Sequence, residues 1–213
     1  MIVTSHGQMD NGKPTGLWLE EFSVPYEQFT EAGYVVIVAS PQGGKTPVDP
    51  RSMPEELTEA DKQALKVLES TISLEELQSP YKAVFFAGGH GTMFDFPNDE
   101  NVSAVVQNAF EKDLPIALVC HGPAALVGAA LPDGTAVVKG RKVTGFTNAE
   151  EQAVNLTKEM PFLLEDKLSE QGGEFSSKEI FKPHVVTDGN LVTGQNPASS
   201  KPAAEALLNL LKK

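Results

Sequence analysis

Short apolar segments alternate along the chain with longer segments in which apolar residues recur at helical spacing. The segment 34–39 is continuously apolar, and segments 81–87 and 115–119 are also rich in apolar residues. Runs of this kind are typical of strands that are buried on both faces of a parallel sheet. In segment 101–112 the apolar residues instead recur every three or four positions, which indicates an amphipathic helix.

Applied to the whole chain, these two patterns predict a series of strands and helices. Strands are predicted at 1–4, 34–39, 81–87, 115–119, 143–146, 174–175, 184–187 and 191–193. Helices are predicted at 16–22, 25–32, 55–70, 101–112, 148–156, 161–172 and 202–211, with a further helix beginning at Pro123. Pro25 is expected to end one helix and start the next, because proline lacks a backbone donor. Turn residues in 131–140 predict a small hairpin.

This alternation predicts an α/β fold in which a mainly parallel central sheet is sandwiched by helices. No linker, internal repeat or low-complexity segment interrupts it, so we expect a single domain spanning 1–213. In open parallel sheets, ligands bind outside the carboxyl ends of the strands. The polar residues that follow the predicted strands are therefore the candidates for chemistry.

The composition narrows the classes of partner. Apolar residues make up 40% and charged residues 22% of the 213 positions, which is ordinary for a globular protein. The net charge of −12 argues against nonspecific binding to nucleic acid or to an anionic membrane surface. No apolar run is long enough to span a bilayer, and the first residues do not resemble an ordinary signal peptide.

The chain contains one cysteine, so no intrachain disulfide is possible and we expect a reducing, cytoplasmic setting. Neither a CxxC nor an HExxH motif is present, and no metal site is expected. A phosphate-binding loop of the form GxxxxGK[ST] is also missing from the sequence.

The cysteine lies where the predicted strand 115–119 ends. Gly122 permits a tight turn, and Pro123 suits the first turn of a helix. A cysteine at such a corner resembles the serine of a nucleophile elbow, and the amides at the helix start would favour its thiolate. The alternative is a buried, inert residue, because free cysteine is among the most buried residue types.

A catalytic thiol needs a proton shuttle and donors for a developing oxyanion. His121 follows Cys120 directly and could act as the shuttle, or it could simply bond to the backbone. Glu150 or Glu151 could orient that histidine, or either could complement a helix start. The residue pattern leaves both pairs of alternatives open.

Two other segments supply candidates for the same edge of the sheet. Gly88 and Gly89 offer unobstructed backbone amides for an oxyanion hole, although a glycine pair can also be only a tight turn. His90 lines the pocket or caps its own loop. Either Glu20 or Glu21 could be an acid of the site, whereas a solvent-exposed helix face is the alternative for both.

Four motifs in a fixed order make the chain resemble a known superfamily, that of PfpI protease and the parkinsonism-associated protein deglycase. They are FFAGGHGTMFDFP at 85–97, VCHGPA at 119–124, VTGFT at 143–147 and LVTGQNPAS at 191–199. The best match is the heat-shock-protein branch of glyoxalase III enzymes and holding chaperones. The resemblance implies a flavodoxin-like, class I glutamine amidotransferase-like fold with a nucleophile elbow, and commonly a homodimer.

The resemblance also assigns roles to individual residues. Cys120 matches the family nucleophile and His121 its neighbouring histidine. The carboxylate of the triad follows the Gly-Phe-Thr motif by four residues, which makes it Glu151. The acid that bonds to the cysteine matches Glu21, and Gly89 matches a loop glycine whose amide faces the site.

The implied reaction needs no cofactor. The cysteine adds to the aldehyde of methylglyoxal or glyoxal, protons move through an enediol, and water releases lactate or glycolate, the activity of a glutathione-independent glyoxalase (D-lactate dehydratase, a lyase). A deglycase, a holding chaperone or stress-related redox protein, and a cysteine amidase or peptidase are the alternatives. Class I glutamine amidotransferases carry a His-x-Glu pair late in the chain. This chain lacks that pair, because His184 is followed by two valines.

Overall fold

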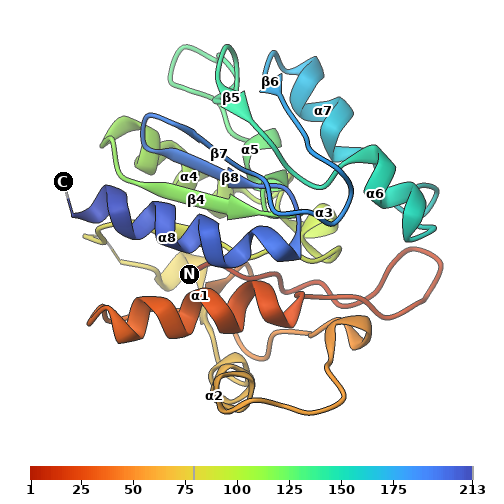
Figure 1. The fold of residues 1–213 in the computed structure, drawn as a ribbon. Helices are drawn as coiled ribbons and strands as arrows, with labels where there is room; N and C mark the ends of the chain where they lie inside the picture. Colours follow the sequence, from red (N-terminus) through yellow and green to blue (C-terminus); the bar gives the residue numbers. More distant parts are fainter. Residues whose placement is uncertain (79, 213) are drawn as a thin grey trace.

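The computed structural model of the chain describes residues 1–78 and 80–212. Its centre is a β-sheet with helices on both faces, which confirms the expected α/β fold (Figure 1). Within these two ranges, no helix combines the length and the apolar character needed to cross a membrane.

Four strands form the middle of the sheet, in the order β3 (Val84–Phe86), β4 (Ile116–Val119), β8 (Leu191–Gly194) and β7 (Val185–Asp188). Strands β3, β4 and β8 run parallel, and β7 is antiparallel to β8. Beyond β3, Ile2 bridges both Phe86 and Ala39. There β1 (Ala39–Ser40) pairs in parallel with β2 (Ile72–Ser73). The sheet is therefore mainly parallel, as the alternation predicts.

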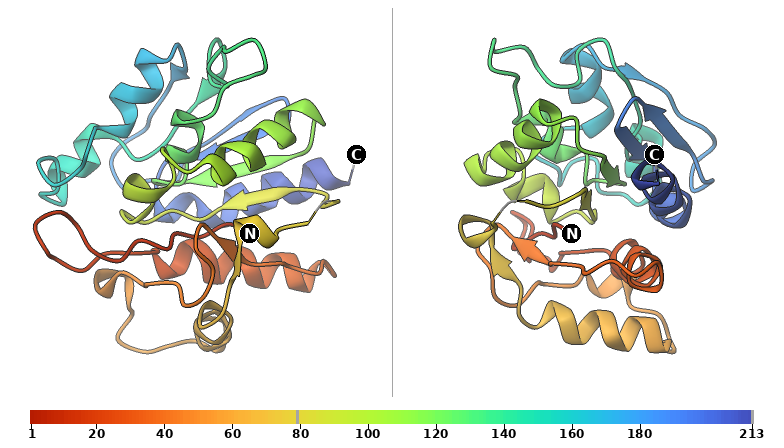
Figure 2. Two further views of the ribbon diagram at one scale, coloured as in Figure 1. Left: turned by 180° about the vertical axis from the view of Figure 1, so that it is seen from behind. Right: turned by 90° about the vertical axis from the view of Figure 1, so that its left-hand side faces the viewer.

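The strands contribute side chains to two hydrophobic cores, because successive side chains of a strand point to opposite faces of the sheet. Phe86 and Leu118 pack in a core with α4 (Glu100–Glu111) and α7 (Leu164–Glu170). Phe85 and Val119 pack in the other core, under α1 (Leu19–Glu31), α2 (Glu59–Leu68) and α8 (Ser200–Leu211). The views from behind and from the side show these two helical layers with the sheet between them (Figure 2).

Several short elements connect the layers. They are η1 (Pro50–Ser52), η2 (Leu74–Glu76), α3 (Thr92–Asp95), α5 (Ala124–Val127), β5 (Lys142–Val143), α6 (Asn148–Ala153), β6 (Glu174–Phe175) and η3 (Pro197–Ser199). Strands β5 and β6 form a separate parallel pair. The hairpin expected at 131–140 is reduced to a single antiparallel bridge between Ala130 and Ala136.

Pro25 does not divide the first helical region, so the expectation of two helices at 16–22 and 25–32 is wrong. Helix α1 runs unbroken from Leu19 to Glu31 with Pro25 in its interior. The proline removes the hydrogen bond to the carbonyl of Glu21. The helix persists because its apolar face, with Phe22 and Phe29, is buried in the core beneath it.

The apolar segment 34–39 is not a fully buried strand, which corrects a second expectation. Val35 is 93% exposed and Ile37 is 49% exposed. Contacts with neighbouring segments begin at Ile37 and Val38, whose carbonyls accept hydrogen bonds from the Met1 N-terminus and the Ile72 N–H, and β-pairing with Ile2 begins at Ala39. Val35 precedes these contacts and therefore lies outside the sheet. Continuous apolar character alone cannot reveal where a sheet ends.

Two valines in this segment give a matched test of that correction. Val38 is only 7% exposed, and its replacement by alanine is expected to lower the free energy of unfolding by about 2 kcal/mol. Val35→Ala is expected to change it by less than about 0.5 kcal/mol. Urea unfolding of both variants checks this, and equal losses would mean that Val35 is buried as the sequence pattern suggests.

Candidate active site

Cys120 occupies the turn that joins β4 to α5. Its backbone φ of +58° lies in the left-handed region, which residues other than glycine rarely adopt. Two hydrogen bonds hold it there: its N–H donates to the Gly194 carbonyl at 2.8 Å, and its carbonyl accepts from the Phe146 N–H at 2.8 Å. A strained backbone conformation of this kind persists only where several surrounding contacts hold it in place. The corner has the strand–turn–helix geometry of a nucleophile elbow.

The helix expected to favour a thiolate is only one turn long, and this corrects the sequence-based expectation. Helix α5 contains four residues, too few aligned peptides for a substantial macrodipole. The cysteine is also 3% exposed. Burial raises the pKa of the Cys120 thiol well above its ordinary value, and the neighbouring Glu21 raises it further. Burial therefore opposes ionisation of the sulfur, and its attack on a substrate needs a group within reach that can take the thiol proton.

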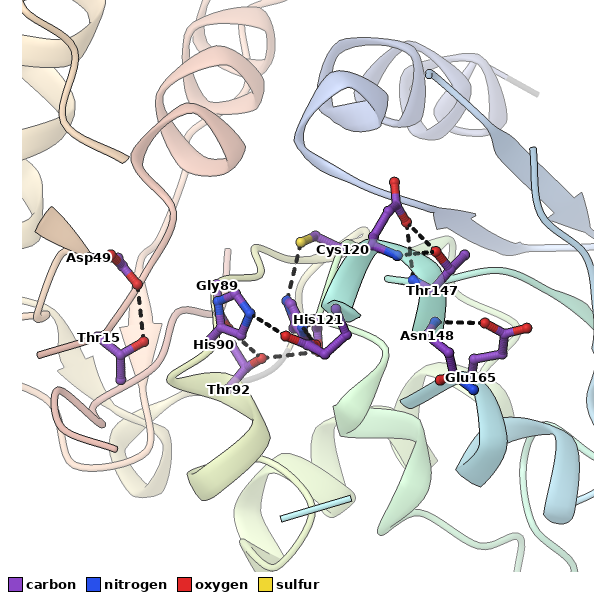
Figure 3. A network of polar contacts seen from close by, with 12 residues as sticks. Thr15, Asp49, Gly89, His90, Thr92, Cys120, His121, Thr147, Asn148 and Glu165 are labelled. Atoms are coloured by element: carbon purple, nitrogen blue, oxygen red, sulfur yellow. Dashed lines mark hydrogen bonds and ion pairs between the residues drawn. The ribbon is translucent and has the colours of Figure 1, made fainter. Parts of the chain in front are cut away.

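His121 and Glu151 form a hydrogen-bonded chain that ends at the sulfur. Figure 3 shows the contact between His121 and Cys120. The His121 Nε2 lies 2.8 Å from Glu151 Oε2, and its Nδ1 lies 3.3 Å from the Cys120 Sγ. Burial alone would raise the pKa of Glu151, but the two adjacent histidines lower it well below its ordinary value. Because the ionised carboxylate can only accept, His121 Nε2 carries the ring proton and Nδ1 is free to accept the thiol proton.

Helix α6 explains why Glu151 and not Glu150 takes this position. Thr147 caps the helix and exchanges hydrogen bonds with Glu150 in a capping box, which turns the Glu150 side chain back over the helix start. The next residue, Glu151, then faces His121. Of the two alternatives that the residue pattern leaves open, the structure joins Glu151 to the histidine.

His90 lies on the other side of the same carboxylate. Its Nε2 is 2.9 Å from Glu151 Oε1, and its Nδ1 is 3.3 Å from Arg51 Nη2. Arginine can only donate, so Nδ1 accepts and the proton on Nε2 is donated to Glu151. Burial, followed by the nearby His121, lowers the pKa of His90 to about 4, so its ring is neutral at pH 7.

Arg51 is itself held by a buried acid. The Asp49 side chain is fully buried and binds the guanidinium through both carboxylate oxygens, with Arg51 Nε at 2.9 Å from Oδ1. Thr15 donates a further hydrogen bond to Asp49 at 3.1 Å. The sequence analysis missed Asp49 and Arg51 because the Pro- and Gly-rich loop around them has no periodicity and no motif.

Glu21 is a second carboxyl group beside the sulfur. It is fully buried, whereas its neighbour Glu20 is exposed. Its Oε2 accepts from the Gly88 N–H at 2.9 Å, and Oε1 has no nitrogen or oxygen partner among the described residues. Burial raises the pKa of Glu21 well above its ordinary value, against the opposing hydrogen bond with Cys120. Together Glu21 and Cys120 therefore carry at most one negative charge.

Two glycines allow the loop after β3 to approach these groups closely. A Cβ on Gly88 would lie 2.5 Å from the Val119 carbonyl oxygen, and one on Gly89 would lie 2.3 Å from the Gly16 carbonyl oxygen. Gly89 also adopts a φ of +112°, which side chains disfavour. Both positions thus require glycine.

The backbone donors differ from the expected oxyanion hole in one respect. The Gly88 amide is already bonded to Glu21, and the His90 ring is bonded to Glu151, so neither is free. The amides of Gly89 and His121 donate to no oxygen within residues 1–78 and 80–212. These two amides are the remaining candidates for binding a developing oxyanion.

A pocket of about 280 Å³ opens beside the sulfur. Cys120, His121 and Gly89 line it together with apolar side chains and Arg51. A larger groove of about 500 Å³ lies by Val35 and Ile37, but no cysteine, histidine or carboxylate is among its described lining residues. The smaller pocket is therefore the candidate active site.

The same cluster could in principle hold a divalent cation. His90, His121 and Glu151 offer ligand atoms that all lie within 4.8 Å of one another. A cation there would displace the two Nε2 protons and so break the hydrogen bonds that orient His121. The observed spacing fits the hydrogen-bonded state.

Known proteins resemble this chain over nearly its whole length. The model of the DJ-1/PfpI family matches residues 15–210. Glyoxalase 3 of Candida albicans is 30% identical over 98% of this chain and 95% of its own length. The glutathione-independent glyoxalase hsp3101 of Schizosaccharomyces pombe is 32% identical over 94% of this chain and 89% of its own length.

Solved structures agree with the sequence comparison. The crystal structure of glyoxalase III from Candida albicans superposes with a TM-score of 0.89 at 29% identity. The match covers 98% of this chain and 94% of that one. The similarity therefore extends over nearly the whole fold.

Proposed function

Because the chain belongs to the DJ-1/PfpI family, and because its cysteine lies beside a histidine and a buried carboxyl group whose pKa is raised, we propose that it is a glutathione-independent glyoxalase. It converts methylglyoxal or glyoxal and water into lactate or glycolate, without a cofactor. The observation that carries the proposal is the buried Cys120 with His121 Nδ1 at 3.3 Å and the Glu21 carboxyl group beside it. Its glyoxalase relatives support the choice of substrate.

The first step forms a bond between Cys120 Sγ and the aldehyde carbon. His121 Nδ1 takes the thiol proton as the sulfur attacks, and the Glu151 carboxylate stabilises the imidazolium that results. The amides of Gly89 and His121 are the donors for the oxyanion that develops on the aldehyde oxygen. Protonation of that oxygen completes a hemithioacetal.

The second step moves a hydrogen from the former aldehyde carbon to the ketone carbon. Glu21 and His121 carry the protons through an enediol, which leaves a thioester of a 2-hydroxy acid. The first carbon is oxidised and the second is reduced, so no external oxidant is needed. The raised pKa of Glu21 suits this work, because its carboxylate is then a stronger base towards a carbon-bound proton and its protonated form can return that proton to the neighbouring carbon.

Water then cleaves the thioester, which releases the hydroxy acid and restores the thiol. The new C–O bond replaces the C–S bond, and a proton returns to the sulfur. The apolar walls of the pocket limit competing water during the earlier steps.

A panel of substrates tests the proposed reaction against its alternatives. The purified protein is incubated without added thiol with methylglyoxal, glyoxal, glutamine and a fluorogenic peptide, and products are followed by NMR and fluorescence. Lactate and glycolate are expected, and ammonia or cleaved peptide is not. Release of ammonia from glutamine, or of fluorophore from the peptide without any lactate, would replace the proposal with an amidase or a peptidase.

Two other activities of the resembled branch give different outcomes in related assays. A deglycase would release free amine from a glycated amino acid at a rate that direct scavenging of free methylglyoxal does not explain. A holding chaperone would suppress aggregation of a client protein even when Cys120 is replaced by alanine.

The proposal includes a homodimer in the cytoplasm. It is supported by the resemblance to a family whose members are commonly dimers and by a single cysteine that forms no intrachain disulfide. Sedimentation velocity of the purified chain tests the dimer. A monomer at micromolar concentration would remove this part of the proposal.

A further inference from the structure

The candidate pocket has more apolar wall than methylglyoxal can occupy. Trp18, Phe146, Val154, Phe181 and Pro197 line it beside Cys120 and His121. Its volume of about 280 Å³ exceeds the roughly 150 Å³ of an apolar cavity that holds a benzene molecule. The single methyl group of methylglyoxal would contact only a few of these apolar side chains.

Phe181 is the exposed member of these walls, and its backbone is fixed. Its side chain is 46% exposed, so it lies at the rim of the pocket. Its φ of +58° is unusual for a bulky residue, and its N–H donates to Glu150 Oε1 at 2.8 Å. Glu150 is fully buried and also accepts from Asn196 Nδ2 at 2.8 Å. A buried carboxylate therefore holds the strained residue in place.

Aromatic rings line the path from Phe181 at the rim of the pocket to His121 beside the sulfur. The Phe181 and Phe146 ring centroids are 6.5 Å apart, and those of Phe146 and His121 are 4.4 Å apart. An apolar or aromatic group placed between them gains contact area along a path that ends beside the sulfur. Phe181 is partly exposed at the rim of the pocket, so its ring can contact a bound substituent.

The one charged group of the pocket wall does not favour an anionic substituent. Arg51 lines the pocket, but both oxygens of the buried Asp49 already pair with its guanidinium. Its charge is therefore largely balanced. The pocket favours apolar over carboxylate-bearing substituents.

We propose that the pocket selects 2-oxoaldehydes whose ketone carbon bears an apolar group larger than methyl, with Phe181 as the specificity-determining residue. This inference rests on the proposed function and uses the same reaction: a 2-oxoaldehyde and water give a 2-hydroxy acid. The aldehyde carbon bonds to Cys120, and the substituent on the ketone carbon lies against Phe181 and Phe146.

The test compares kcat/KM for glyoxal, methylglyoxal and phenylglyoxal in the native chain, in Phe181→Asn and in Ile180→Asn. Asparagine tolerates a positive φ, so the first variant keeps the backbone conformation. Ile180 is 44% exposed but is not among the residues that line the pocket, which makes it the matched control. Thermal melting checks that both variants fold.

The native chain is expected to prefer phenylglyoxal over methylglyoxal by about tenfold. Phe181→Asn is expected to lower kcat/KM for phenylglyoxal about tenfold and for glyoxal less than about twofold, and Ile180→Asn to change neither. If glyoxal and methylglyoxal react but phenylglyoxal is the poorest substrate, or if Phe181→Asn weakens all three equally, only the inferred specificity falls. If none of the three reacts, the proposed function itself falls.

Discussion

Replacing Cys120 by alanine is expected to lower kcat/KM for methylglyoxal by at least about a thousandfold while the fold persists. Among the described residues that line the pocket, the Cys120 sulfur is the strongest nucleophile, with His121 Nδ1 at 3.3 Å to remove its proton. Alanine removes the nucleophile and leaves the hydrogen bonds between the two histidines and Glu151 in place. Lactate formation measured by NMR checks the loss.

The same variant carries its own control, because the chain has one cysteine. Thiol titration of the unfolded variant must read zero, and circular dichroism must match that of the native chain. The loss of one sulfur from a buried site is expected to cost only about 1 kcal/mol of stability. Lactate formation at the native rate by the folded variant would rule out the covalent route.

The second large effect is expected at Glu21. Glu21→Gln keeps the size of the side chain and an oxygen for the Gly88 amide, but removes the exchangeable acidic proton beside the sulfur. Loss of a positioned acid or base costs a factor of about 100 to 10,000, so kcat is expected to fall by at least about a hundredfold.

Glu20 supplies the matched control for this change. It precedes Glu21 in the same helical turn, but its side chain is exposed. Glu20→Gln is expected to leave kcat within about twofold of the native value. Equal losses in the two variants would show that burial beside the sulfur does not distinguish the two acids.

The sequence predicts most of the fold because buried strands and helices each require a characteristic spacing of apolar residues. Strands such as β4 are buried on both faces and read as apolar runs, and their carboxyl ends meet at one edge of the sheet. Residues that are distant in sequence, such as Glu21, Gly88 and Cys120, are brought together at that edge. The resemblance separated Glu21 from Glu20 and Glu151 from Glu150, which residue types alone left open.

The remaining features depend on tertiary context. The interior Pro25 is tolerated because the rest of α1 packs on the core, and no local signal reports that packing. Arg51 reaches His90 from the three-residue helix η1, which is too short for periodicity or a motif to mark it. The raised pKa of Cys120 follows from its burial beside Glu21, which a helix-start argument cannot supply.

Rapid acid quenching followed by mass spectrometry of the intact chain tests the central claim most directly. During turnover of methylglyoxal, a fraction of the native chain is expected to carry the mass of one methylglyoxal on Cys120, and this adduct should appear and decay at the rate of lactate formation. The Cys120→Ala chain should show none. Lactate formation with no adduct on Cys120, or with an adduct that outlasts turnover, would contradict the account.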